Sequence, residues 1–253
     1  MTRLMLLLSI LLLPAALPAQ EAAAPAAKAT ATPVPASDLL MRRSGPGFSW
    51  RWRAAPEVAT QRALLAQLRS EAQARALKAR RDADAEAATA RAAGATMRGH
   101  EHVEDWALAA DTPRLLALAG TTYAYTGGAH GNMVYSAVLW DKASRRTIAL
   151  PDLFTDWPAA RALLAPAFCA ALAEERQRRL TGTDLPAGTC PEFATLPMLP
   201  YGDVFPVARE LRVLVAPYVA GAYAEGSYLI TLPWPDGIAP LVQPRYRADL
   251  GLS

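Results

Sequence analysis

The stretch VEDWALAADTPRLLALAGTTYAYTGGAHGNMVYSAVLWDKASRRTIAL, residues 103–150, decides the fold of this chain. Four of its segments, 103–110, 115–125, 133–140 and 147–150, alternate apolar with polar or small side chains at the two-residue period of a β-strand. Short segments of turn-forming residues separate them: DTP, a glycine-rich loop and DKAS. Because adjacent strands joined by short turns pair antiparallel, the stretch predicts an antiparallel meander.

One helix is predicted on each side of this stretch. Upstream, residues 56–93 have helical spacing, and Gly94 stands where the helix should end. One face of this helix carries a stripe of small or apolar side chains: Leu65, Leu68, Ala72, Ala76, Ala79 and Ala83. Downstream, residues 158–179 end in an arginine-rich turn that suits the helix dipole. Their apolar face is Leu163, Leu164, Phe168 and Leu172.

The remaining strands are predicted near the two ends of the chain. Residues 48–53 place a phenylalanine and two tryptophans on one face and are expected to form the first strand. Residues 210–216 and 227–233 are expected to form the last two. The predicted fold class is therefore α+β, with an antiparallel β-sheet packed against a long N-terminal helix and a second helix, and with one disulfide.

The first residues have the pattern of a secretory signal peptide. Arg3 supplies a positive charge, an apolar run follows, and small residues near Ala19 form a cleavage zone. The apolar run is shorter than the roughly 20 residues of a spanning helix, which favours a cleaved signal peptide over the alternative of an uncleaved anchor. We expect export to the periplasm and no transmembrane segment in the mature chain. The expected parts are a signal peptide, 1–19, a flexible Ala/Pro-rich tether, 20–47, and one α+β domain, 48–253, with parts 48–142 and 143–253.

Cys169 and Cys190 are the two cysteines of the chain. In an oxidising compartment, an even number of cysteines makes a disulfide the expected state. Cys169 lies on the second predicted helix, so a bridge to Cys190 would tie the following loop back to that helix.

The net charge of +3 is unevenly distributed over the sequence. Basic residues gather on the first predicted helix, at Arg69, Arg75, Lys78, Arg80 and Arg81, and on the second, at Arg176, Arg178 and Arg179. We expect solvated helix faces there, although a basic surface could also attract anionic cell-wall or outer-membrane material. Export argues against nucleic acid as a partner.

The histidines raise the question of a metal site. His100 and His102 would lie on the same side of a strand, where Asp105 or His130 could complete a zinc site. The spacing is not one of the closed patterns of structural zinc sites, so neither a metal nor a cofactor is predicted. A metal-dependent envelope hydrolase that uses His100, His102 and His130 is kept as an alternative.

Two glycine-punctuated segments, YAYTGGAHGN at 123–132 and YVAGAYAEGS at 218–227, supply candidate ligand-binding residues. In the first, strand alternation resumes at Met133 where a phosphate-binding loop would enter a helix. Its glycines suit a wide hairpin turn, with or without contact to a ligand. In the second, rings and a carboxylate could stack on and hydrogen-bond to a sugar, or the tyrosines could simply close over a core. The candidates are Tyr125, Gly127, Gly128, His130, Asn132, Tyr218, Tyr223 and Glu225.

No set of nucleophile, base and acid is recognisable in the sequence. Ser227 follows Glu-Gly and lacks the Gly-x-Ser-x-Gly context of a nucleophile elbow, and both cysteines are expected in the disulfide. We therefore predict no catalytic residues and no enzymatic activity.

Three motifs, YTGGAHG at 125–131, LPDLF at 150–154 and YxxGxYAEG at 218–226, together resemble a known extracytoplasmic domain. It is shared by RsiV-type anti-sigma factors, which sense lysozyme, and by the N-terminal, non-catalytic part of PdaC-type peptidoglycan deacetylases. The resemblance implies an α+β domain outside the cytoplasm that acts as a receptor for lysozyme or as an accessory to a cell-wall enzyme. Much of this family has no known function. The chain has no counterpart of the sigma-binding segment or of the deacetylase domain, so the resemblance implies neither signalling nor hydrolysis.

We therefore predict an exported, monomeric binding module for a cell-envelope ligand, either peptidoglycan or an envelope protein. A lysozyme-binding or lysozyme-inhibiting protein is the alternative. Lysozyme is itself basic, so long-range repulsion from a chain of net charge +3 works against that alternative.

Overall fold

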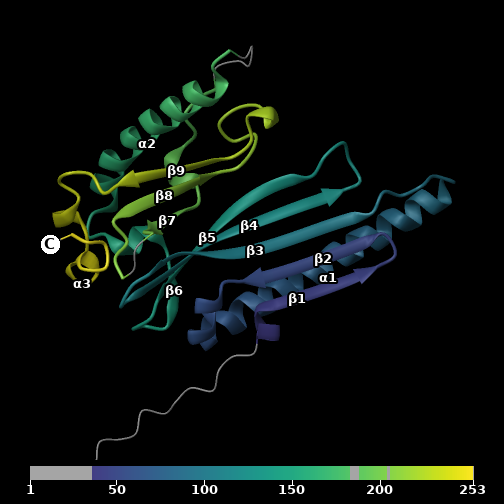
Figure 1. Ribbon diagram of the computed structural model, residues 1–253. Coiled ribbons are helices and arrows are strands. Elements are labelled where there is room, and N and C mark those ends of the chain that lie inside the picture. The colour runs from purple at the N-terminus through teal and green to yellow at the C-terminus, as the bar shows by residue number, and fades with distance from the viewer. Residues whose placement is uncertain (1–35, 183–187, 204–205, 253) are drawn as a thin grey trace, which may run out of the picture. The chain divides into compact units, whose positions relative to one another are not determined.

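The computed structural model describes residues 36–182, 188–203 and 206–252 (Figure 1). These residues belong to one compact unit, Pro33–Ser253. The predicted signal peptide, 1–19, and the part of the predicted tether up to residue 35 lie outside the described residues.

Six strands form the first sheet, in the order β1-β2-β3-β4-β5-β6. They are β1 Leu40–Gly45, β2 Phe48–Ala54, β3 His100–Asp111, β4 Leu115–Thr126, β5 Asn132–Asp141 and β6 Arg146–Ile148. Pairing from β3 to β6 is antiparallel, which confirms the predicted meander. β2 pairs with β3 in parallel, because the crossover through helix α1, Arg62–Ala92, returns the chain to the same end of the sheet.

Strand β1 corrects two expectations from the sequence. The segment 48–53 is the second strand and not the first, because β1 precedes it and pairs antiparallel with β2. β1 also lies inside the range 20–47 that the sequence assigned to a flexible tether. Its sequence, LMRRSG, lacks a regular alternation of apolar residues, so its strand conformation depends on the neighbouring β2.

A second, antiparallel sheet contains β7 Met198–Tyr201, β8 Glu210–Val215 and β9 Tyr228–Pro233, in that order. β8 and β9 confirm the strands predicted at 210–216 and 227–233. β7 was not predicted, because it has four residues and one of them is Pro200, which cannot donate a backbone hydrogen bond. The other helices are η1 Ala36–Leu39, η2 Pro56–Thr60, η3 Leu150–Leu153, α2 Trp157–Leu180, η4 Phe193–Thr195, η5 Tyr223–Glu225, η6 Ala239–Leu241 and α3 Pro244–Arg247.

Helix α1 packs on one face of the six-stranded sheet, and the second sheet with α2 lies on the other side (Figure 1). The core under α1 contains Trp52, Leu68, Leu116 and Leu118. The predicted stripe of α1 is buried there, with Ala79 only partly covered. Small side chains at these positions let the helix backbone approach the sheet closely.

The second core joins α2 to β7–β9 and to the opposite face of β4 and β5. Leu164, Phe168 and Leu172 of α2 are buried in it, as predicted. Leu163 is 39% exposed, contrary to the prediction, because it lies one position outside this buried face. Cys169 of α2 forms the predicted disulfide with Cys190, with their Cα atoms 5.5 Å apart.

Candidate functional site

Two loops that are far apart in the sequence meet through three aromatic side chains. His130 belongs to the loop between β4 and β5, whereas Tyr218 and Tyr223 belong to the connection between β8 and β9. The His130 ring stacks on Tyr223, with centroids 3.9 Å apart and an interplanar angle of 19°. Tyr218 lies 5.2 Å from Tyr223 and 6.4 Å from His130, again between ring centroids. We call His130, Tyr218 and Tyr223 the aromatic cluster.

Hydrogen bonds connect the same two loops. The Tyr223 hydroxyl donates to the Gly131 carbonyl at 2.9 Å. His130 Nδ1 lies 2.9 Å from that carbonyl, and because a carbonyl oxygen only accepts, Nδ1 carries a proton. In the neutral imidazole, Nε2 is then an acceptor for the Tyr218 hydroxyl, 3.3 Å away. The cluster thereby holds a hairpin of the first sheet against a loop of the second.

Tyr218 and His130 are the exposed members of the aromatic cluster, whereas Tyr223 is half-buried. Tyr218 is 58% exposed, and its backbone φ is 71°, in the left-handed region that non-glycine residues rarely adopt. Such a conformation costs roughly 1–3 kcal/mol and persists only where surrounding contacts hold it. The contacts with His130 and Tyr223 are the ones that hold the Tyr218 ring at the surface.

The other candidates from the first loop have mainly backbone roles. Gly127 has φ 87°, and the Gly128 carbonyl accepts a hydrogen bond from Arg98 at 3.3 Å. A Cβ atom at Gly131 would overlap the ring of Tyr123, so the close approach requires glycine there. The Asn132 side chain accepts from the Met133 amide at 3.0 Å. Tyr125 is half-buried and lies opposite Glu101 on β3.

Glu225 is occupied within the fold and is not free to bind a ligand. Its side chain is 1% exposed and accepts two hydrogen bonds from Arg176, at 2.8 and 2.9 Å. The Tyr228 hydroxyl and the Ala222 amide also donate to it, at 2.8 and 3.0 Å. The hydrogen bonds from Arg176 lower the pKa of Glu225, and Glu225 raises the pKa of Arg176. This ion pair joins α2 to η5, the turn that carries Tyr223.

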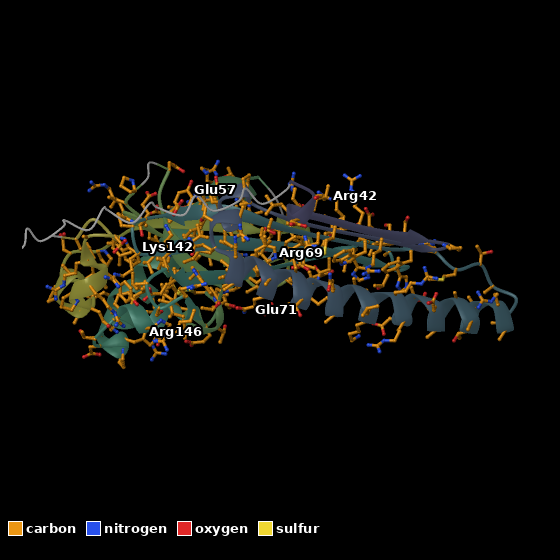
Figure 2. All side chains as sticks on the ribbon, turned by 90° about the horizontal axis from the view of Figure 1, so that it is seen from below. Arg42, Glu57, Arg69, Glu71, Lys142 and Arg146 are labelled. Atoms are coloured by element: carbon orange, nitrogen blue, oxygen red, sulfur yellow. A yellow bond between two sulfur atoms is a disulfide. The ribbon has the colours of Figure 1, made fainter. Side chains whose placement is uncertain are left out.

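The ion pair also corrects the expectation that the arginines of the second helix are solvated, because Arg176 is buried. On α1 the basic residues are exposed or half-buried, but several pair with acidic side chains: Lys78 with Asp82, Arg80 with Asp84, Arg75 with Glu104 and Arg69 with Asp38. Figure 2 shows Arg69 between α1 and β1, with Glu71 on the outer side of the helix. These ion pairs neutralise part of the positive charge of α1 and so interrupt its basic surface.

Two of the three histidines considered for zinc, His100 and His102, belong to β3, and His100 contacts α1. His100 Nε2 is 2.8 Å from Glu86 Oε2 of α1, and the His100 and His102 rings are 6.4 Å apart. Burial, and secondly the neighbouring His100, lower the pKa of His102. His130 lies instead in the aromatic cluster. Within residues 36–182, 188–203 and 206–252, no three His, Cys, Asp or Glu side chains form a group that could hold a metal ion.

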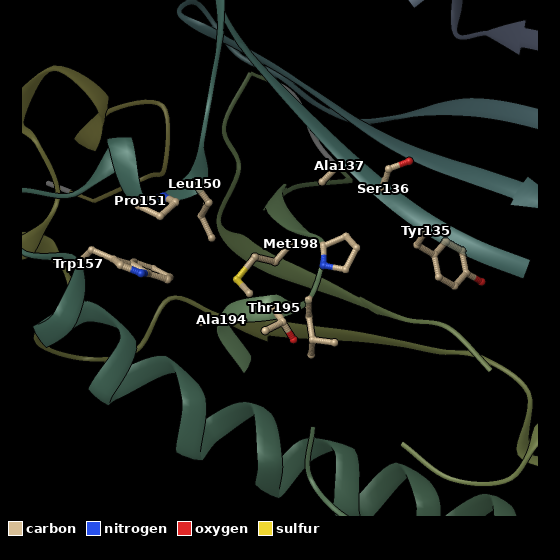
Figure 3. Close-up of a pocket in the computed structure, with 11 residues that line it drawn as sticks. Tyr135, Ser136, Ala137, Leu150, Pro151, Trp157, Ala194, Thr195 and Met198 are labelled. Carbon is tan, nitrogen blue, oxygen red and sulfur yellow. The ribbon is translucent and has the colours of Figure 1, made fainter. Parts of the chain in front are cut away.

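A pocket of about 370 Å³ opens between β5 and the segment that leads into β7 (Figure 3). Tyr135 and Ala137 of β5, Leu150, Trp157 of α2, Ala194 and Met198 are among its lining residues. Figure 3 shows Trp157 at one end and Tyr135 at the other, with Met198 between them. No local sequence pattern predicts this pocket, because its walls come from four separate segments of the chain.

Comparison with known proteins supports the resemblance to one of the two protein types. Residues 54–133 match a family model described as deacetylase PdaC. The matched segment runs from the end of β2 through α1 to the start of β5 and includes His130, but not Tyr218 or Tyr223. No curated protein matches the chain.

Solved structures of DUF3298-family proteins are also similar. One, from Bacteroides fragilis NCTC 9343, has a TM-score of 0.52 at 14% identity and covers 79% of this chain and 85% of its own. Another, from Pseudomonas aeruginosa PAO1, has a TM-score of 0.47 at 14% identity, with 81% and 94% covered. The similarity to the Bacteroides fragilis structure shows a shared fold. The predicted resemblance to a family largely of unknown function is thus confirmed.

Proposed function

We propose that the protein is a binding module for a cell-envelope glycan, with peptidoglycan as the ligand and the aromatic cluster as the contact surface. The observation that carries this proposal is the exposed Tyr218 ring, which lies at the surface against the rings of His130 and Tyr223 in spite of the unfavourable Tyr218 φ of 71°. Flat rings bind the apolar faces of sugars, and their hydroxyls bind the polar edges. No catalytic step is part of the proposal.

The expected location supports a ligand in the envelope. The disulfide between Cys169 and Cys190 is typical of proteins that fold in an oxidising compartment. No helix in the described part of the chain combines the length and the apolarity needed to cross a bilayer. Together with the signal-peptide pattern of residues 1–19, the disulfide supports a periplasmic protein.

Retention on insoluble peptidoglycan tests this function. Tyr218→Ala should lower the affinity about fivefold, because an aromatic contact is worth on the order of 1 kcal/mol. The double variant His130→Ala, Tyr223→Ala should lose retention, since it removes the rings that position Tyr218. The measurement is the bound fraction after sedimentation of the peptidoglycan.

Val219→Ala is the matched control, because Val219 is 42% exposed in the same loop but has no ring. It should be retained like the wild type. Equal retention of the wild type and of the double variant would contradict a role for the aromatic cluster.

A further inference from the structure

One edge of the six-stranded sheet has no paired strand along most of β5 in the part of the chain that the structure describes. β4 pairs along β5 on one side, whereas on the other side β6 pairs only with Leu139, Trp140 and Asp141. Residues 132–138 therefore have no neighbouring strand on that side in the part of the chain that the structure describes. An uncovered edge of this kind presents backbone donors and acceptors to any chain that approaches in an extended conformation.

Two hydrogen bonds show which backbone groups point away from β4. The Lys142 amide donates to the Arg114 carbonyl across the β4–β5 pair, so even-numbered residues direct their backbone groups toward β4. The Met133 amide instead donates to the side chain of Asn132 at 3.0 Å. Since the direction alternates along a strand, Tyr135 and Ala137 direct their N–H and C=O groups outward.

The β5 edge carries none of the charges that usually protect an edge strand. Its sequence from 132 to 138 is NMVYSAV, and Val134 is 50% exposed. The opposite edge of the same sheet, β1, carries Arg42 and Arg43. Arginine and lysine on an edge strand discourage pairing with other chains. β1 therefore carries the charges expected of an edge that stays unpaired, whereas β5 lacks them, as expected of an edge that pairs with another chain.

The pocket described above adjoins the same backbone groups. Tyr135 and Ala137 line it, together with Leu150, Trp157 and Met198. An added strand beside β5 would place alternate side chains on the side of the sheet where this pocket opens. Its volume of about 370 Å³ accepts one large apolar or aromatic side chain.

We propose that the β5 edge binds an extended segment of a partner protein as an additional strand, with one apolar or aromatic side chain of that segment in the Trp157 pocket. Hydrogen bonds from Tyr135 and Ala137 supply the affinity, and the pocket selects the side chain. The uncharged edge suits an uncharged stretch of polypeptide. This site is separate from the aromatic cluster, so it does not rest on the proposed binding of a glycan.

A random dodecapeptide library displayed on phage and selected on the full protein supplies the probe. Selected peptides should share one large apolar residue within a strand-forming sequence without proline. A synthetic copy of the most enriched peptide should then slow amide exchange at Tyr135 and Ala137 of the wild type by about tenfold or more. Selection that enriches no peptide, or unchanged exchange at these two amides, would overturn the proposal.

Two variants test the edge and the pocket separately by fluorescence anisotropy. Ala137→Pro removes an outward donor that β4 does not use, and Ala194→Trp fills the pocket from an exposed position. Each should weaken binding of the peptide about tenfold, the loss expected for one hydrogen bond or one apolar contact. Ala137→Ser, which keeps the amide, and Tyr218→Ala, which alters the aromatic cluster, should bind like the wild type.

Unchanged binding by both Ala137→Pro and Ala194→Trp would place the peptide elsewhere and refute the proposal. Sedimentation of the variants distinguishes self-association. If the wild type is a dimer and Ala137→Pro is a monomer, the edge pairs with a second copy of the chain, and the proposed partner is wrong.

Discussion

Replacing Glu225 with alanine is expected to lower the free energy of unfolding by about 3–5 kcal/mol. The substitution leaves the buried guanidinium of Arg176 without its carboxylate and also removes the acceptor of the Tyr228 hydroxyl. Groups left buried without a partner lose their hydration and gain nothing in exchange. For a folded region of this size, the loss corresponds to a fall of roughly 6–20 °C in the thermal midpoint. Calorimetry or circular dichroism measures this shift.

The double variant Arg176→Met, Glu225→Met separates charge from packing. It should recover much of the lost stability, because two apolar side chains need no counter-charge. Asp82→Ala, which breaks the exposed pair with Lys78, should leave the midpoint unchanged within error. An Asp82→Ala loss as large as that of Glu225→Ala would contradict the special role of the buried pair.

The same ion pair predicts a dependence of stability on pH. Arg176 holds the pKa of Glu225 below its ordinary value of 4.5. A carboxyl whose pKa is lower in the folded state contributes stability above the unfolded pKa and loses it as the pH falls through the folded pKa. The wild type should therefore lose more stability than the double methionine variant when the pH falls below 4.5. Parallel curves for the two proteins in acid would refute this assignment.

Replacing both cysteines with serine is expected to lower the free energy of unfolding by about 3 kcal/mol. The bridge closes a loop with a sequence separation of 21 and joins α2 to the segment that leads into η4 and β7. Its loss enlarges the conformational freedom of the unfolded chain. Thermal unfolding of the oxidised wild type and of the double variant measures the difference.

Two observations check that the disulfide is the cause. Reduction of the wild type should reproduce the midpoint of the Cys169→Ser, Cys190→Ser variant, and retention on peptidoglycan should be unchanged, because neither cysteine belongs to the aromatic cluster. An unchanged midpoint under oxidising conditions would show that the bridge contributes nothing to stability.

Local patterns predicted the elements whose side chains alternate or repeat regularly. The period of two in β3, β4 and β5 and the small-residue stripe of α1 were sufficient, because each element buries one face and its sequence records that face. β1 escaped prediction because its sequence, with two arginines, lacks a regular alternation, and β7 because it has four residues, one of them a proline. Their strand conformation depends on a neighbour in space.

The candidate site was predicted in part. The sequence singled out His130, Tyr218 and Tyr223 from glycine-rich segments, and the structure brings these three together. It also singled out Glu225, which the fold uses for Arg176 instead. A carboxylate in a loop has the same sequence whether it faces water or an arginine 49 residues away, so sequence could not distinguish the two.

By itself, the sequence determined the α+β class, the strands with regular alternation, the pairing of the cysteines and the two loops that form the aromatic cluster. Each of these depends on residues that are close in the chain or on a choice among very few partners. Only the tertiary structure decided the parallel pairing of β2 with β3, the burial of Arg176 with Glu225, and the open edge of β5 beside the Trp157 pocket. These features arise where distant segments meet, and the free energy of such contacts is a property of the packed fold that no single segment records.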